Sequence, residues 1–234
     1  MSVAENIADV RERITAAARR AGRDPGEITL MAVSKTFAVE HIREAYADGL
    51  RVFGENRVQE FIGKAAALRN LRDAEWHMIG HLQSNKAAAA AELFTAIDSL
   101  DSLRLAEKLN ASAEKLGKKL GVLIEINVGG ETAKSGLAPD SGDLEDLLMA
   151  APGLDHLELR GLMTIPPFTE DAQEARPYFR QLRALRDQIA AQRLPAVRVD
   201  VLSMGMSHDF EIAIEEGSTC VRVGTAIFGP RKGS

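Results

Sequence analysis

The sequence has 234 residues, 45% of them hydrophobic, and its 29 basic and 34 acidic residues give a net charge of −5. Nucleic acids and anionic membranes bind positively charged surfaces, so this balance argues against both as partners. The single cysteine, Cys220, cannot form an internal disulfide, which fits a reducing compartment. The N-terminus lacks the apolar core of a signal peptide, and no stretch is apolar enough to span a bilayer. We therefore expect a cytoplasmic protein.

The chain begins with a predicted amphipathic helix, in which apolar residues recur at helical spacing from Val3 to Ile14. Short β-like runs follow, each succeeded by a helix-like segment, at residues 28–35, 51–56, 75–82, 94–101, 121–129, 156–165, 197–205 and 219–228. Strict alternation predicts parallel strands with helical crossovers. We expect an α/β fold, a single (β/α)8 TIM-type barrel domain over residues 1–234, with the extra N-terminal helix covering one end. A doubly wound open sheet is the alternative, but regular units without a composition break favour closure.

A barrel predicts where function should lie, because active sites gather at the carboxyl ends of the strands and phosphates often bind after strands seven and eight. The polar residues and turns expected at those ends are Lys35, Asn56, His81, Asn127, Thr164, Ser203 and Gly224-Thr225.

Lys35 ends the apolar run "LMAVSK" and so lies at the mouth of the predicted barrel. One interpretation is a lysine whose stem lies on apolar surface while its ammonium reaches solvent. The other is a Schiff-base lysine, whose amine must be partly desolvated to be nucleophilic.

The last two predicted strands end in "LSMGMS" (202–207) and "TCVRVGTAIFG" (219–229). If Val221 and Val223 face the helices, Arg222 points into the barrel, where an interior salt bridge is the alternative to a ligand contact. Gly224-Thr225 leaves backbone N–H groups free, which suits a phosphate. The hydroxyls of Ser203 and Ser207, with another glycine between them, add to this expectation.

Strand alternation also predicts a polar barrel lumen in which acidic and basic side chains balance, as buried charges require. The residues assigned to it are Glu125, Glu158 and Asp200 against Arg160, Arg222 and Lys35. No metal site is predicted, because the five histidines lack the HExxH spacing and one cysteine gives no zinc pattern.

The residues assembled above resemble those of the YggS/PROSC family of pyridoxal-phosphate-binding proteins, the PLP homeostasis proteins. The resemblance runs over nearly the whole chain, in "AVSK", "FGENRVQE", "WHMIGHLQSNK", "INVGGETAKSGL", "LRGLMTIPP" and "LSMGMSHDFEIAIEEGSTCVRVGTAIFG". It implies an α/β barrel like the N-terminal domain of alanine racemase.

The resemblance also implies a role for individual residues. Lys35 would hold pyridoxal 5′-phosphate (PLP) covalently as an internal aldimine, with Asn56 beside the cofactor. Ser203, Met204, Gly224 and Thr225 would bind the phosphate, largely through backbone amides. Arg222 would face the pyridine nitrogen, and His81 is near the ring by position.

The function implied is that of a monomeric PLP carrier and regulator of the free cofactor pool, without efficient catalysis. Its partners would be PLP-dependent apoenzymes or enzymes of vitamin B6 metabolism. The alternative is a PLP-dependent amino-acid racemase. An arginine at the pyridine nitrogen weakens the electron sink and argues against it, but alanine racemases tolerate such an arginine. The further argument is the lack of a second base.

That base in alanine racemases is a tyrosine of a C-terminal β-domain, whereas Tyr46 and Tyr178 fall here on predicted helices outside the barrel. A third interpretation is a barrel with a purely structural or partner-binding role. It would require that Lys35, Arg222 and the two segments expected to bind phosphate, at the ends of the last two strands, occur together by coincidence.

Overall fold

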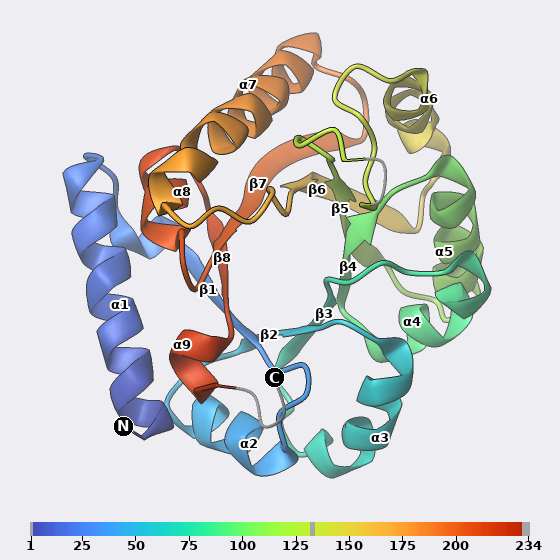
Figure 1. Cartoon of the computed structure of the whole chain (residues 1–234). Helices are drawn as coiled ribbons and strands as arrows, with labels where there is room; N and C mark the ends of the chain where they lie inside the picture. The colour runs from blue at the N-terminus through green and yellow to red at the C-terminus, as the bar shows by residue number, and fades with distance from the viewer. Residues whose placement is uncertain (1, 132–133, 231–234) are drawn as a thin grey trace.

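A computed structural model describes residues 2–131 and 134–230, and within them eight parallel strands close into a barrel (Figure 1). The strands are β1 (Thr29–Val33), β2 (Val52–Glu55), β3 (Glu75–Met78), β4 (Ala96–Leu100), β5 (Leu120–Glu125), β6 (Leu157–Met163), β7 (Val197–Met206) and β8 (Cys220–Val223). They pair in chain order, and β8 pairs with β1 to complete the ring. The predicted TIM-type barrel is confirmed.

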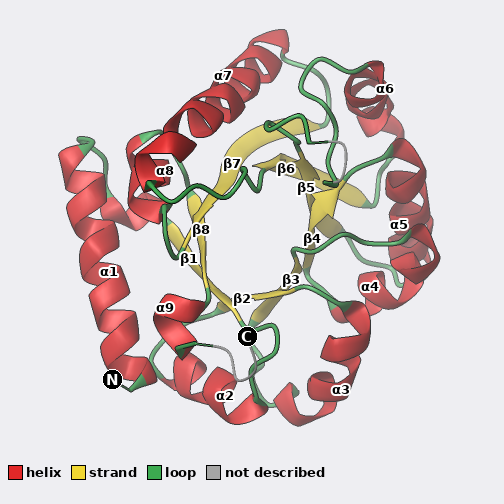
Figure 2. Ribbon diagram, viewed as in Figure 1, coloured by secondary structure: helices red, strands yellow, loops and turns green. Residues whose placement is uncertain are grey.

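The helices lie outside the ring of strands, as Figure 2 shows. They are α1 (Val3–Arg20), α2 (Val39–Ala47), α3 (Val58–Leu68), α4 (Ala87–Leu93), α5 (Leu103–Lys115), α6 (Gly142–Ala150), α7 (Arg176–Gln192), α8 (Phe210–Glu215) and α9 (Thr225–Phe228). Their buried faces pack on the outward side chains of the strands to form the main core. No helix in the described part of the chain is long and apolar enough to cross a membrane.

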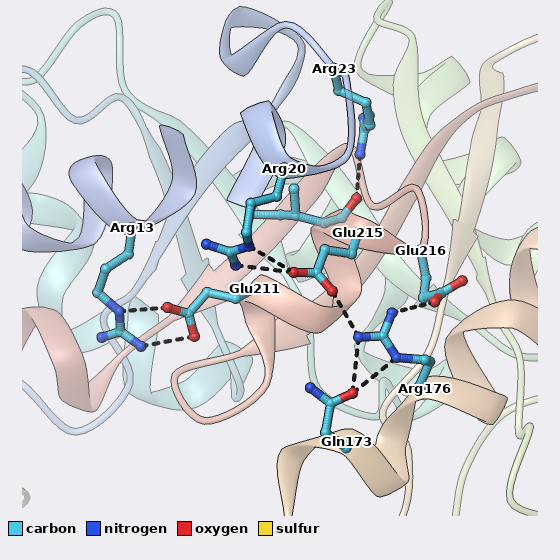
Figure 3. A network of polar contacts seen from close by, with 9 residues as sticks. Arg13, Arg20, Arg23, Gln173, Arg176, Glu211, Glu215 and Glu216 are labelled. Carbon is cyan, nitrogen blue, oxygen red and sulfur yellow. Dashed lines mark hydrogen bonds and ion pairs between the residues drawn. The ribbon is translucent and has the colours of Figure 1, made fainter. Parts of the chain in front are cut away.

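The N-terminal helix α1 forms as predicted, but its position differs from the prediction. Ser2 caps it in a reciprocal capping box with Glu5. Its apolar stripe packs against α2, α8 and α9 in the outer layer, so the expectation that it covers one end of the barrel is wrong. The reason is that α8 and α9 are only 6 and 4 residues long, and α1 covers the outer surface that they leave. Arginines of α1 also form ion pairs with carboxylates of α8 (Figure 3).

The last predicted strand, residues 219–228, is shorter in the structure. The strand β8 ends at Val223, and the N–H groups of Ile227 and Phe228 both donate to the carbonyl of Gly224 in a turn of helix. A helix of one turn has too few residues to show helical periodicity, so its apolar residues are easily mistaken for strand.

The predicted charge-balanced lumen is wrong. Arg222 and Glu125 are buried, whereas Glu158 pairs with Arg160 at 2.6 Å in an exposed position. Asp200 is likewise exposed and pairs with a neighbour on its own strand, Arg198. Arg160 and Asp200 line the cavity at the amino ends of the strands, where they are accessible rather than enclosed in the lumen. Register shifts also interrupt the β5–β6 and β6–β7 ladders, so strict alternation does not hold along β6 and β7.

Candidate functional site

A cavity of about 230 Å³ opens at the carboxyl ends of the strands. It is lined by Val33, Lys35, Asn56, Ile79, Ile165, Phe168, Met206, Ser207, His208, Arg222, Gly224 and Thr225. The structure therefore places five of the seven predicted site residues around one cavity, namely Lys35, Asn56, Arg222, Gly224 and Thr225. Ser203 and Met204 do not line it.

Lys35 reaches this cavity because β1 is apolar up to its end. Met31 and Val33 are buried in the lumen, in a small cluster with Ile79 and Cys220. Ser34 is fully buried, and Lys35 follows it in a turn, half-buried. Partial burial of an amine at such a mouth is the setting in which lysine becomes a nucleophile.

Asn56 follows β2 and approaches the loop after β3 very closely. A Cβ atom at Gly80 would lie 2.4 Å from the backbone oxygen of Asn56, so only glycine fits there. Gly80 thus allows the half-buried Asn56 to take its place in the cavity wall.

Arg222 lies on β8, in register with Met31 of β1, and only 3% of it is exposed. Its Nη1 donates to the carbonyl (2.7 Å) and the hydroxyl (2.8 Å) of Ser203, and its Nη2 donates to the carbonyl of Thr164 at 2.7 Å. Among the described residues no carboxylate lies within ion-pair distance of it, so the interior salt bridge is not formed. Burial lowers the pKa of Arg222, but a guanidinium stays protonated in proteins, and the three bonds fix its orientation.

Ser203 and Met204 lie beneath the cavity surface. The Ser203 hydroxyl accepts from Arg222, and Met204 is fully buried in the core outside the barrel wall. Met206 and Ser207 line the cavity in their place. A bulge causes this, because Ser203 pairs with Cys220 while Met206 pairs with Arg222, which adds one residue to β7.

Ser207 connects the loops after β7 and β8. Its hydroxyl accepts from the N–H groups of Gly224 (3.2 Å) and Ala226 (3.4 Å). These two amides lie at the start of α9, where the sequence predicted a phosphate, and both point to the position of the Ser207 hydroxyl oxygen. An anionic oxygen near that position could accept hydrogen bonds from the same amides.

Glu125 and His81 lie near this mouth without lining the cavity. Glu125 is 5% exposed, and burial raises its pKa. One of its oxygens accepts from the Ser135 hydroxyl, and the other has no partner among the described residues. His81 is exposed and pairs with Asp101 at 2.9 Å.

A larger cavity of about 430 Å³ lies at the amino ends of the strands. Its charged side chains form ion pairs with neighbouring groups, for example His77 with Asp98 at 3.1 Å and Arg160 with Glu158 at 2.6 Å. Cys220 also lines it, but burial raises the pKa of this thiol to about 12, so it stays protonated. No lysine among the described residues lines this cavity, and we assign the site to the other mouth.

The lining of the carboxyl-end cavity fits the cofactor that the resemblance implies. Lys35 supplies an amine for an aldehyde, Arg222 a fixed cation, and Val33 and Ile79 apolar surface for a ring. The amides of Gly224 and Ala226 can donate to phosphate oxygens. No group of histidine, cysteine and acidic side chains in residues 2–131 and 134–230 could hold a metal ion.

Residues 6–232 match the alanine racemase N-terminal domain family. The chain is 49% identical over 232 residues to the pyridoxal phosphate homeostasis protein of Aquifex aeolicus, covering 99% of this chain and 100% of that one. It is 46% identical over 236 residues to the protein of that name from Escherichia coli strain K12, covering 98% and 97%.

The structure of PipY from Synechococcus elongatus with PLP bound superposes with a TM-score of 0.84, at 40% identity over 97% of this chain and 100% of PipY. An alanine racemase of Clostridium difficile superposes with a TM-score of 0.70 at 17% identity, over 98% of this chain and 58% of the racemase. The second likeness shows the fold alone. With relatives this similar over almost its whole length, the chain belongs to the pyridoxal phosphate homeostasis protein family, built on the alanine racemase N-terminal barrel.

Proposed function

We propose that this protein binds PLP in the cavity at the carboxyl ends of its strands and buffers and hands on the cofactor in intracellular PLP homeostasis. The observation that carries the proposal is the convergence of Lys35, Arg222 and the Gly224 amide on one cavity. Relatives at 40–49% identity bear the homeostasis name, and the PipY structure contains PLP. When bound, PLP supplies a reactive aldehyde and an electron-accepting ring.

Each lining residue has a part in this proposal. The Lys35 amine bonds covalently to the cofactor as an internal aldimine, and Asn56 lies beside the ring. Arg222 faces the pyridine nitrogen, held there by Ser203 from beneath. The backbone at Gly224 and Thr225 binds the phosphate together with the Ser207 hydroxyl, while Met204 supports β7 through its packing.

A PLP-dependent amino-acid racemase is the second candidate, because alanine racemases share the barrel. Two observations favour a protein without efficient catalysis. A cation at the pyridine nitrogen keeps that nitrogen unprotonated and weakens the electron sink; alanine racemases tolerate such an arginine, so the second observation carries more weight. The two tyrosines of the chain lie on α2 and α7, and Tyr46 donates its hydroxyl hydrogen bond to Asp73, away from the cavity. Neither is placed to act as a second base.

We further propose that the chain acts as a monomeric, single-domain protein in the cytoplasm. Its partners would then be PLP-dependent apoenzymes that receive the cofactor, or enzymes of vitamin B6 metabolism that supply it. No basic surface for nucleic acid or membranes is expected at a net charge of −5.

Borohydride reduction tests the proposal directly. Incubating the protein with PLP and reducing it should fix one cofactor, and peptide mass spectrometry should locate it on Lys35. Lys35→Ala should lose this adduct and the visible absorption of the bound cofactor while melting like the wild type, since Lys35 is half-buried and adds little packing. Lys134→Ala is the matched control, a lysine on a loop near the same mouth. A wild-type protein that fixes no PLP on Lys35 would contradict the proposal.

A further inference from the structure

Thr36, the residue after Lys35, has a left-handed backbone conformation with a φ of 66°. This region is unfavourable for β-branched residues and persists only where surrounding contacts impose it. Glycine would adopt it at no steric cost. The turn that carries the proposed PLP lysine is therefore strained.

The contacts that impose this conformation come from α3. The Thr36 N–H donates to Glu60 Oε1 at 2.5 Å, and the same oxygen lies 2.7 Å from Lys64 Nζ. Lys64 Nζ in turn donates to the carbonyl of Ser34 at 3.0 Å. The peptide groups on both sides of Lys35 are thus bonded to one ion pair, between residues four apart on a helix.

A buried carboxylate anchors this ion pair. Glu55 is fully buried at the end of β2 and accepts from Lys64 Nζ at 3.1 Å and from the Ser34 hydroxyl at 2.7 Å. The side chains of Lys64 and Glu55 are only 12% and 0% exposed, so this end of the group is shielded from solvent and holds its geometry.

We propose that Glu60 and Lys64 are positioning residues that hold Thr36 in its left-handed conformation and so direct the Lys35 amine into the cavity. The inference rests on the proposed function, in which Lys35 bonds to PLP. Neither residue lines the cavity, so both act through the backbone of the turn.

The test compares Glu60→Ala, Glu60→Gln, Thr36→Gly and the double variant Thr36→Gly/Glu60→Ala. Glu60→Gln keeps an oxygen that can accept from the Thr36 amide, and should behave almost as wild type. Glu60→Ala loses the acceptor, Thr36 relaxes, and the rate at which PLP is fixed on Lys35 should fall at least about tenfold, since small misplacements of a reacting group are costly. Glycine at position 36 tolerates the left-handed conformation unaided, so the double variant should recover much of that rate.

A second measurement needs no cofactor. The three-bond coupling between the amide and α protons of Thr36 reports φ in isotope-labelled protein, and should change in Glu60→Ala but not in Glu60→Gln. Should Glu60→Ala fold poorly, Lys64→Gln is measured in the same way, with the same change expected. The positioning role is overturned if Glu60→Ala fixes PLP at the wild-type rate, or if the double variant is no faster than Glu60→Ala. A wild-type protein that fixes no PLP on Lys35 overturns the proposed function itself.

Discussion

Arg222 combines a buried charge with neutral hydrogen-bond partners, the two carbonyls of Thr164 and Ser203 and the Ser203 hydroxyl. Beside a pyridine nitrogen it would favour the unprotonated ring. Replacing it by glutamate should favour the protonated ring and strengthen the electron sink of bound PLP. We therefore expect Arg222→Glu to exchange the α-proton of an added amino acid with solvent deuterium faster than wild type, as measured by NMR.

The same variant also tests the racemase alternative. Racemisation should stay slow in Arg222→Glu, because neither tyrosine is placed as a second base, and the enantiomeric excess of recovered amino acid measures this. Some stability should be lost, since the carboxylates of Asp98, Asp209 and Glu125 act on Arg222 electrostatically and would repel a glutamate. Arg222→Gln controls for the loss of the cation alone. Fast racemisation by the wild-type protein would contradict the carrier function and support the racemase alternative.

Of the two serines predicted near the phosphate, Ser207 lines the cavity and Ser203 does not, so substituting each of them tests the proposed phosphate contact. PLP should bind at least about a hundredfold more tightly than pyridoxal, because two or three charge-assisted hydrogen bonds contribute roughly 1.5–3 kcal/mol each. Ser207→Ala should reduce this ratio several-fold in a spectroscopic titration. Ser203→Ala should weaken both ligands alike, because its hydroxyl bonds to Arg222. Equal binding of PLP and pyridoxal by wild type would contradict the phosphate assignment.

The sequence predicted those site residues whose position depends only on where a strand ends. Asn56 and Gly224 follow a strand directly and Lys35 follows one after Ser34, so alternation and strand order brought them to one mouth. Ser203 and Ser207 were both predicted near the phosphate, but the bulge in β7 that brings Ser207 to the cavity in place of Ser203 leaves no local pattern. Glu60 was missed because it lies on the following helix and reaches back to the Lys35 turn through space. Only a folded structure brings those two segments together.

At the scale of elements, the short helix α8 depends on ion pairs with its neighbours (Figure 3). Glu215 accepts from Arg20 of α1 at 3.0 Å and from Arg176 of α7 at 2.7 Å. Six residues are too few for a helix to be stable alone. The short helix α8 therefore depends on these ion pairs, which connect it to α1 on one side and to α7 on the other. The sequence predicted α1 from its periodicity, but pairing between segments almost 200 residues apart leaves no local signal.

Glu215→Gln should therefore lower the free energy of unfolding by about 1–2 kcal/mol near neutral pH, measured by urea denaturation. The hydrogen bond from Arg176 lowers the pKa of Glu215. A lowered pKa gives stability that is present above the unfolded value near 4.5 and is lost as the pH falls through the folded value. The variant should thus show a shallower acid decline than wild type.

Asp200→Asn is the matched control for this measurement, because it breaks an exposed pair in which both side chains are more than half accessible. Its cost should stay within about 0.5 kcal/mol. An equal cost for Glu215→Gln and Asp200→Asn would contradict the role given to the α8 ion pairs.

At the scale of the whole molecule, the two ends of the barrel differ in the side chains that line them. The carboxyl mouth holds the half-buried amine of Lys35, while the amino mouth contains the larger cavity, whose charged side chains are paired with one another or with neighbours. The buried Asp98 side chain on β4 pairs with His77 on β3, so this pair connects neighbouring strands of a closed ring. Because every strand is paired on both sides, weakening the pair should lower the stability of the barrel as one cooperative unit.

His77 should make that stability fall on the alkaline side. Burial disfavours its charged form, but the attraction of Asp98 and Glu75 outweighs burial and raises the pKa of His77 to about 9. A raised pKa gives stability that is fully present below the unfolded value near 6.5 and is lost as the pH rises through about 9. A change of this size corresponds to at most roughly 3 kcal/mol in the free energy of unfolding.

The measurement is urea denaturation of wild type, His77→Gln and His81→Gln at a series of pH values from 6 to 10. The difference in unfolding free energy between wild type and His77→Gln should be largest near pH 6 and should shrink steadily up to pH 10. Taking this difference cancels the titration of lysines and tyrosines, which both proteins share. His81→Gln, at an exposed histidine that also pairs with an aspartate, should retain most of the wild-type alkaline decline. Parallel curves for wild type and His77→Gln over this range would show that the buried pair does not bind its proton more tightly in the folded barrel.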